Sequence, residues 1–425
     1  MYKRSLAPIG RLTRRACGRC ALGGAGVMLI TAWAAPTAGA DDLATALSSF
    51  ASGTAYGAFR LRTEHVVQDT RTKPAIAHTA RTRLGYASGR WRDGSILIEL
   101  ENTTAIGAER FNDGTDPTGR RPTIPDPDST EVNQVALRYE GFAATELILG
   151  RRRIVLDNER FIADAAFRQN QQTFDGGSIV NRSLPLTELR YDFVSGVQRP
   201  SGHDADDGTF NTTGHLFHVS FRGLARTLLA AYGYVFDVDD DRTLSSQTLG
   251  VRLNGDRPLG NDWSATFDLD VARQTDYADN PRDFGLAYYL VRPGVAHRGF
   301  EAWVGYEVLD GDRRQAVQTP FGNLHKFQGF ADVFMTTPAV GIVDRHVGFE
   351  WKRPKLFGLD SLRIWGAYHD FDARAGGADL GSELDLAVAA SFARRYTLTA
   401  KWARYDAAEF ATDTSKVWLM LEISF

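Results

Sequence analysis

The sequence predicts an all-β protein, a transmembrane antiparallel up-and-down β-barrel of about 18 strands, with 16 strands as the alternative count. Three observations predict this fold. Hydrophobic and polar residues alternate along almost the whole chain after residue 53, which places each set on one face of a strand. The polar face carries charges of both signs, as the wet interior of a barrel tolerates. The last segment, 417–425, also alternates, and it ends on Phe425.

The alternation is easy to follow in the first strand, where Phe59 and Leu61 alternate with Arg60 and Arg62. A soluble β-sandwich would alternate as well. Here, however, segments of about ten residues recur over the whole chain, which is the length that a membrane-spanning strand needs. The same pattern recurs in 81–86, 96–101, 134–139, 188–193, 217–222 and 265–271.

Residues 1–40 are predicted to be a cleaved signal peptide. Lys3 and five Arg precede an apolar stretch at 21–35, and Ala38-Gly39-Ala40 offers small residues before the expected cleavage point. The apolar stretch is short for a transmembrane helix. We expect 41–53 to be a short periplasmic N-terminal segment and 54–425 to be an outer-membrane β-barrel.

Removal of residues 1–40 changes the formal net charge from −3 to −9, because that segment holds six basic residues and no acid. A mildly acidic chain argues against a nucleic-acid partner. Both cysteines, Cys17 and Cys20, are removed with the signal, so the mature chain has neither disulfides nor a thiolate metal site. We expect no cofactor and no bound metal. The acidic tip at 237–241 is interpreted as a solvated turn rather than a calcium site.

The strand count rests on which connections are short. Nineteen candidate segments can be found, but single-chain bacterial barrels have an even number of strands. Counting from both ends agrees only if 310–343 is one outer loop, so 327–335 is not a wall strand and eighteen remain. The weakest strand predictions are 174–181 and 246–255. Short periplasmic turns are expected at 87–93, 141–143, 182–185, 223–226, 255–262, 293–299, 353–360 and 394–395. Outer connections are expected at 68–79, 103–130, 151–174, 195–213, 237–246, 273–283, 310–343, 372–381 and 407–414.

The alternating last strand with its terminal Phe425 resembles the assembly signal of bacterial outer-membrane barrels. We therefore expect localisation in the bacterial outer membrane. The expected partners are outer-membrane lipid and lipopolysaccharide, and the barrel assembly machinery through Phe425.

The candidate chemistry is electrostatic selection along the lumen, because charged rings bias which ions or anionic solutes pass. The alternative is that the charges pair across strands and stiffen the wall. The luminal strand positions are Arg60, Arg62, Arg81, Arg83, Glu99, Glu101, Arg138, Glu188, Arg190, Asp192, Arg222, Asp268 and Asp270.

The segment 150–175 is dense in Arg, Asn, Gln and Asp, yet it keeps apolar Ile154, Leu156, Phe161 and Phe167. A solvated surface loop does not need such apolar anchors, whereas a loop folded back into the barrel does. We interpret it as a constriction rather than an outer loop packed on itself. The residues that this interpretation places near the path are Arg152, Asp157, Arg160 and Arg168.

Catalysis has little support in the sequence. The nine His are scattered, and the chain lacks a Gly-x-Ser-x-Gly elbow, a phosphate loop and a His-Glu-x-x-His motif. His218 falls on the luminal face of its strand and is interpreted as a wall residue rather than a catalytic base. We therefore expect no enzymatic activity.

Several motifs resemble one family. They are GRRRIVLDNERF (150–161), FRQNQQTFD (167–175), EVNQVALRYEG (131–141), SSQTLGVRL (245–253), ARQTDYADNP (272–281), HKFQGFADVFMTTPAVGI (325–342) and GSELDL (381–386). In order and content they resemble the alginate export family of outer-membrane barrels. That resemblance implies an 18-stranded barrel with an Arg-rich pore and a gating or plugging loop at 325–342. Carried onto this sequence, it implies that Arg151, Arg153, Asp157, Asn158, Arg160, Arg168 and Gln169 belong to the constriction.

The resemblance favours a passive, anion-favouring channel that passes acidic polysaccharide or small anionic solutes. It also implies a monomer that docks with periplasmic export partners. The mature chain looks shorter than the alginate exporter, so the resemblance supports a channel more strongly than alginate. The alternatives are a general small-solute uptake porin, an outer-membrane enzyme on a barrel scaffold, and a closed structural barrel.

Overall fold

The computed structural model of the chain describes residues 40–108, 110–114 and 119–425. The chain divides into two units, Met1–Leu47 and Ser48–Phe425, and helix α2 (Ala40–Ala51) spans the boundary between them. The predicted signal peptide, apart from Ala40, lies outside the described residues. No helix in the described part of the chain is long and apolar enough to cross a membrane.

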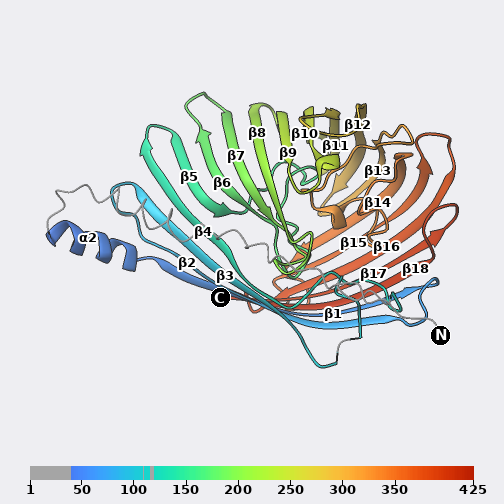
Figure 1. Cartoon of the computed structure of the whole chain (residues 1–425), viewed down its shortest axis with the longest axis horizontal. Coiled ribbons are helices and arrows are strands. Elements are labelled where there is room, and N and C mark those ends of the chain that lie inside the picture. Colours follow the sequence, from blue (N-terminus) through green and yellow to red (C-terminus); the bar gives the residue numbers. More distant parts are fainter. Residues whose placement is uncertain (1–39, 109, 115–118) are drawn as a thin grey trace, which may run out of the picture. The chain divides into compact units, whose positions relative to one another are not determined.

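Eighteen antiparallel strands form one closed sheet, which confirms the predicted fold class and the larger strand count (Figure 1). Each strand pairs with its neighbours in the sequence. The strands are β1 (Thr54–Gln68), β2 (Ala75–Ala87), β3 (Gly94–Ala105), β4 (Ser129–Phe142), β5 (Thr145–Arg152), β6 (Thr173–Asn181), β7 (Thr187–Gln198), β8 (Thr209–Leu224), β9 (Thr227–Val238), β10 (Ser246–Gly260), β11 (Trp263–Asp276), β12 (Gly285–His297), β13 (Phe300–Leu309), β14 (Ile342–Pro354), β15 (Ser361–Ala373), β16 (Asp379–Phe392), β17 (Tyr396–Ala407) and β18 (Thr414–Ser424), with short 3-10 helices η1 (Arg242–Leu244) and η2 (Leu324–Lys326).

The first and last strands close the barrel. Leu61 of β1 pairs with Leu421 of β18 on one side and with Ala80 of β2 on the other. Gly57 and Phe425 exchange backbone hydrogen bonds of 2.8 and 3.0 Å, so the ladder continues to the final residue. Closure leaves no sheet edge with unpaired backbone groups, which is the condition for strands to cross a membrane.

The connections alternate between short turns at one end of the barrel and longer loops at the other. The two weakest strand predictions both form wall strands, β6 and β10. Residues 310–341 form a single connection between β13 and β14, so 327–335 stays out of the wall as predicted.

Two predicted turns are longer than the observed ones. The turn predicted at 255–262 spans only 261–262, and the one predicted at 293–299 spans only 298–299. Pro258 and Pro293 indicated early strand ends. Both prolines nevertheless lie within strands, because each occupies a position where the strand pairing is irregular. Pro258 lies at the register shift between β10 and β11. Pro293 lies in the part of β12 that does not pair with β13.

The two faces of the sheet differ as the alternation requires. Leu84, Leu249, Val271 and Leu419 are exposed on the outer face. The inner face carries buried charged groups such as Arg62, and the principal hydrophobic cluster also lies inside the barrel. Loops must therefore enter the lumen to cover that inner face.

Candidate functional site

Residues 153–172, which connect β5 to β6, fold into the barrel. Ile154 and Leu156 are buried in a cluster with inward-facing residues of β7 to β12. The ring of Phe161 packs against those of Tyr232 and Tyr288, with centroids 5.7 and 5.2 Å apart. The apolar residues that distinguished this segment in the sequence are therefore its anchors. We call residues 153–172 the first luminal loop.

Polar contacts fasten the other side of the first luminal loop to β1 and β3. Arg60 and Arg62 both donate to the carbonyl oxygen of Phe167, at 3.3 and 2.7 Å. The backbone N–H of Gln171 donates to Glu101 Oε1 at 2.8 Å. Luminal charges of both signs thus hold the loop, because a carboxylate accepts from backbone N–H groups and a guanidinium donates to carbonyl oxygens.

Residues 157–159 form a tight bend in the first luminal loop. Asp157 and Glu159 both have positive φ, 51° and 74°, and Asn158 Oδ1 accepts from the backbone N–H of Arg160 at 3.1 Å. Asp157 Oδ1 lies 3.0 Å from His218 Nε2 on β8. His218 is therefore a wall residue that fixes the bend, as interpreted from the sequence.

Residues 310–341, which connect β13 to β14, also enter the lumen, and we call them the second luminal loop. Phe321 joins the same buried cluster as the first luminal loop. Phe334 packs on Phe371 of β15 with ring centroids 4.7 Å apart. The backbone N–H of Ala331 donates to Glu383 Oε1 on β16 at 2.6 Å. This loop therefore spans from one side of the wall to the other.

The two luminal loops also bind each other. Ala163 N–H donates to the carbonyl oxygen of Phe321 at 2.8 Å, and Lys326 Nζ lies 2.8 Å from Glu159 Oε1. The Phe167 ring stacks on the imidazole of His325, with centroids 3.4 Å apart. Together the loops form one block that narrows a barrel otherwise wide enough for an aqueous channel.

A buried group of charged and polar side chains is centred on Asp332. Its carboxylate lies 2.7 Å from His325 Nδ1, 2.8 Å from Arg168 Nη2 and 3.2 Å from Lys416 Nζ on β18. All four side chains are at least nine-tenths buried. We call this group the Asp332 anchor, because it joins both luminal loops to the wall.

The Asp332 anchor should weaken in acid. Burial lowers the pKa of His325 to about 3, although Asp332 opposes the shift. The pKa of a released His325 would return to about 6.5. The released state therefore binds more protons between these values, so attachment is favoured above about pH 6.5 and weakens as pH falls towards 3. We expect single-channel current noise to be greater at pH 4.5 than at pH 7.5.

His325→Gln provides the control, because glutamine keeps a hydrogen-bond donor but does not titrate. We expect this variant to lose the part of the response between pH 6.5 and 4.5. Burial raises the pKa of Asp332, but His325, Lys416 and Arg168 outweigh it and hold that pKa well below its usual range. The Asp332 contribution is thus present above about pH 3.9 and is lost at lower pH. An unchanged noise profile in His325→Gln would contradict the role of His325.

Most of the Arg residues predicted to line the path are buried supports. Arg160 is 2% exposed, lies 3.2 Å from Glu307 Oε1 and has its guanidinium over the Phe327 ring. Other residues that were predicted to line the path, including Glu99, Glu188 and Gln169, are also paired or hydrogen-bonded. The pairs are Arg60 with Glu422, Arg62 with Asp126, Arg81 with Glu422, Arg83 with Glu101, Arg152 with Asp192, Arg190 with Asp192, Glu99 with Asn133, Glu188 with Arg182, and Gln169 with Thr79.

Arg151 does not line the lumen, which corrects the prediction. It pairs in register with Val135, whose side chain is exposed on the outer face, and cross-strand partners share a face. Its guanidinium binds Asp175 at 2.7 and 2.9 Å. The three consecutive Arg at 151–153 cannot all face one side of a strand, because successive side chains alternate.

A cavity of about 360 Å³ lies on the luminal side of β2 to β7, towards the end of the short turns, and the first luminal loop contributes Arg153 to its lining. Its charged lining is strongly basic, with Glu146 as the single acid among the lining residues. We call it the basic chamber. Its basic residues are Arg138, Arg152, Arg153, Arg182 and Arg190.

Arg153 is the chamber cation that remains available. Glu146 Oε1 lies 2.8 Å from Arg138 Nε, and Glu146 Oε2 lies 3.6 Å from Arg182 Nη1. Asp192 binds the guanidiniums of Arg152 and Arg190. Among the described residues, no ion pair or side-chain hydrogen bond engages the guanidinium of Arg153, which is exposed. A small anion entering the chamber would therefore find one free guanidinium among others already oriented by carboxylates.

Arg182 and Glu146 were missed by the sequence reasoning. Both lie at strand ends beside short turns, where alternation no longer indicates a face. Arg182 Nε also binds Glu188 Oε2 at 2.8 Å, which directs it over the chamber. The only available signal was the grouping of charged residues next to consecutive turns.

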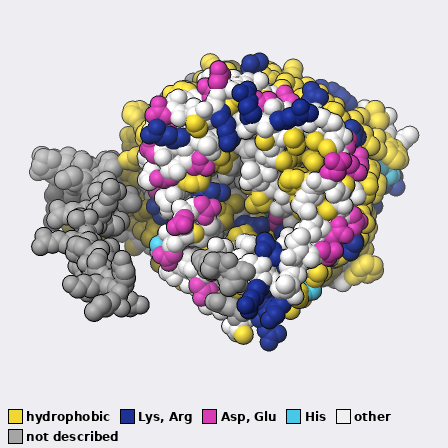
Figure 2. All heavy atoms as spheres, turned by 45° about the vertical axis from the view of Figure 1, so that its right-hand side comes forward, with side chains coloured by type: hydrophobic (Ala, Val, Ile, Leu, Met, Phe, Trp, Pro, Cys, Tyr) yellow, Lys and Arg dark blue, Asp and Glu magenta, His cyan; other side chains and the backbone are white. Residues whose placement is uncertain are grey.

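A second cavity, of about 300 Å³, lies on the long-loop side and is lined in part by Arg71, Arg168, Asp332 and Lys416. In the space-filling view, the visible face has a central hollow with charged side chains of both signs around it (Figure 2). Hydrophobic side chains gather at the outer margin of that face. The two cavities lie on opposite sides of the luminal loops. A solute crossing the barrel would meet polar, charged surfaces on both.

No family model matches the sequence, and neither does any curated protein. Solved structures do resemble it. The barrel superposes on Pseudomonas aeruginosa OccK9 (OpdG) with a TM-score of 0.68 and 15% identity, covering 89% of this chain and 100% of that one. Acinetobacter baumannii OccAB1 gives a TM-score of 0.68 at 15% identity, with 89% and 97% covered. Pseudomonas aeruginosa OpdK, solved with vanillate, gives 0.65 at 15% identity, with 87% and 98% covered.

At these identities the likeness shows the fold alone. The chain has the 18-stranded barrel of outer-membrane porins, matched over nearly the full length of each neighbour. These neighbours are Occ and Opd proteins, so the resemblance to the alginate export family is supported only at the level of an outer-membrane porin barrel.

Proposed function

We propose that the protein is a passive channel of the bacterial outer membrane for small anionic solutes, above all small carboxylates. The observation that carries this proposal is the basic chamber with Arg153, whose guanidinium has no ion-pair partner among the described residues, next to the block of luminal loops. The fold supports the location, because the outer face is apolar and every strand edge is paired. OpdK, a similar barrel, was solved with vanillate, which is an aromatic carboxylate.

The size of the passage favours small solutes over export of an acidic polysaccharide. The two luminal loops are anchored by buried apolar residues, bind each other and are tied to the wall on both sides. A polymer requires a continuous open path, whereas a chamber of about 360 Å³ has the volume of an ordinary small-molecule site. The general small-solute interpretation is therefore preferred to the alginate interpretation.

The chamber can select anions by a simple mechanism. The planar guanidinium of Arg153 can bind a carboxylate through two parallel hydrogen bonds. Glu146 and Asp192 partly neutralise the neighbouring Arg residues, so the chamber attracts an anion without holding several charges tightly against it. Passage requires this balance, because a solute must bind well enough to enter and weakly enough to leave.

Arg153→Ala tests the proposal. Because a hydrogen bond to a charged group contributes about 1.5–3 kcal/mol, we expect the half-saturating concentration for vanillate to rise by roughly tenfold or more. Uptake is measured in liposomes that contain the refolded protein. The reversal potential in a salt gradient should also move towards cations in Arg153→Glu.

Arg151→Ala is the matched control, because it removes an adjacent guanidinium from the outer face. We expect its uptake of vanillate to equal that of the unchanged protein. Equal uptake by Arg153→Ala and Arg151→Ala would contradict the chamber as the selective site. A channel that favours cations from the outset would contradict the proposed function itself.

A further inference from the structure

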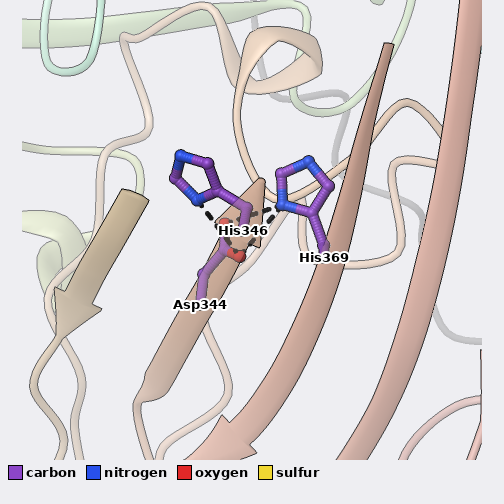
Figure 3. Close-up of side chains that lie close together, drawn as sticks. All are labelled: Asp344, His346 and His369. Carbon is purple, nitrogen blue, oxygen red and sulfur yellow. Dashed lines mark hydrogen bonds and ion pairs between the residues drawn. The ribbon is translucent and has the colours of Figure 1, made fainter. Parts of the chain in front are cut away.

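Three potential metal ligands lie together on the luminal face of β14 and β15, away from the basic chamber. Asp344 and His346 are two residues apart on β14, and His369 is the direct cross-strand partner of His346 (Figure 3). Because all three side chains project from paired strands, their relative positions are fixed by backbone hydrogen bonds. Sites built on such elements are more precise than sites on loops.

The separations of the ligand atoms suit one metal ion. His369 Nδ1 lies 2.9 Å and His346 Nδ1 lies 3.4 Å from Asp344 Oδ1, and all three ligand atoms lie within 4.8 Å of one another. Around an ion with bonds of roughly 2.0–2.1 Å, neighbouring ligands are about 2.9–3.4 Å apart in octahedral or tetrahedral geometry. Two of the three edges already have this length, and rotation of one imidazole can shorten the third.

Asp344 and His369 form a hydrogen-bonded pair, and this pair does not account for the position of His346 beside it. Its side chain is 9% exposed, and its Nδ1 makes no hydrogen bond within the described part of the chain. The ring lies against Gly305 of β13, where an added Cβ would come within 1.9 Å of His346 Nε2. The glycine therefore leaves room for an imidazole whose Nδ1 is directed at the carboxylate.

The surroundings would also accommodate a cation. Asp344 is the cross-strand partner of Glu307, and both carboxylates are at least 98% buried. Like charges directly opposite each other destabilise a sheet. Arg160, 3.2 Å from Glu307 Oε1, compensates Glu307, so a cation at the cluster would compensate Asp344. Asp385 Oδ2 lies 3.9 Å from His369 Nε2, the ring nitrogen that faces away from the cluster. This distance exceeds hydrogen-bond length, so Asp385 places negative charge beside the His369 ring without a direct hydrogen bond to it.

We propose that Asp344, His346 and His369 bind one divalent transition-metal ion, such as Zn²⁺, in the lumen wall. Two imidazole nitrogens and one carboxylate favour zinc, copper or nickel over magnesium and calcium, which prefer all-oxygen sites. The site adjoins the second luminal loop, because Asp385 also accepts from the backbone N–H of Phe330 at 3.0 Å. A bound ion would thus add positive charge beside the block that narrows the barrel.

The proposal is tested by isothermal titration of Zn²⁺ into the refolded, EDTA-treated full chain in detergent. We expect one saturable site per chain that excess Mg²⁺ or Ca²⁺ does not occupy. Loss of an orienting carboxylate alone weakens metal binding about 10–100-fold, so loss of a ligand in His346→Ala or His369→Ala should weaken it at least tenfold. Bound Co²⁺ should show visible d–d absorption. This absorption should be absent from the double variant, which carries both His346→Ala and His369→Ala.

His203→Ala is the matched control, because His203 also lies beside two carboxylates, Glu131 and Asp204, but is exposed and contacts them through different ring nitrogens. We expect it to bind Zn²⁺ as the unchanged protein does. Heat-modifiable gel mobility verifies folding, and His→Gln variants replace any alanine variant that does not refold. No Zn²⁺ binding by the unchanged chain, or unaltered binding by the double variant, would overturn the proposal.

Discussion

Deletion of residues 312–340 should raise the single-channel conductance several-fold while leaving the barrel intact. The second luminal loop leaves the wall and returns to it at adjacent points, since Leu309 pairs with Ile342 and Gly311 touches Gly341. The deletion therefore joins β13 to β14 through the short turn Asp310-Gly311-Gly341. An Asp-Gly turn of this length is typical of β-hairpins. Conductance in a planar bilayer measures the result.

The physical reason is that an 18-stranded wall encloses a lumen wide enough for water, so the loops set the limiting width. Removing one of two mutually bound loops also removes the support of the other. The matched control deletes 203–207, which shortens a surface loop between Gly202 and Gly208, two residues that are also adjacent. We expect no large change there. Equal conductance in the two deletions would mean that the second luminal loop does not limit the channel.

Asp332→Ala should release the second luminal loop from its wall contact and produce frequent current fluctuations. The substitution leaves Arg168 and Lys416 buried without their shared carboxylate. Removing one partner of a buried ion pair costs about 3–5 kcal/mol, because the remaining charge is uncompensated. The wall should stay folded, since its hydrogen-bonded ladder does not involve Asp332. Single-channel recordings and proteolysis at Lys326 report the release.

Asp312→Ala is the matched control for this substitution. It removes the same group from the same loop, but the Asp312 side chain is 30% exposed and its partner Arg314 is a surface residue. We expect few added fluctuations and little added cleavage. If Asp332→Ala were as quiet and as resistant to proteolysis as Asp312→Ala, the Asp332 anchor would not be what holds the loop.

The wall could be predicted from the sequence because its determinants are local. Each strand needs only a period of two, and short turns separate strands that must then be neighbours. The assignment of 310–343 to one loop followed from the same logic, since an even strand count with both ends on one side allows no other choice. The apolar anchors Ile154, Leu156 and Phe161 likewise indicated that the first luminal loop turns inward, because a solvated loop has no use for them.

The roles of the charged residues depended on the tertiary structure. Alternation can place Arg62 on the luminal face, but it does not indicate that Asp126, from a distant loop, neutralises it. It also cannot show that Asp192 binds Arg152, whereas no described residue forms an ion pair with the adjacent Arg153. Such pairings join positions far apart in the chain, and a local period carries no information about them.

The sequence by itself therefore determined the barrel and the faces of most strands, because backbone pairing and side-chain alternation are properties of neighbouring residues. It favoured 18 strands over 16, and the tertiary structure decided that count. The tertiary structure decided which guanidinium is available to a solute, how the two luminal loops lock together at Asp332, and that His346 and His369 meet across β14 and β15. These features depend on register and loop packing, in which groups that are distant in sequence share one buried, low-dielectric environment.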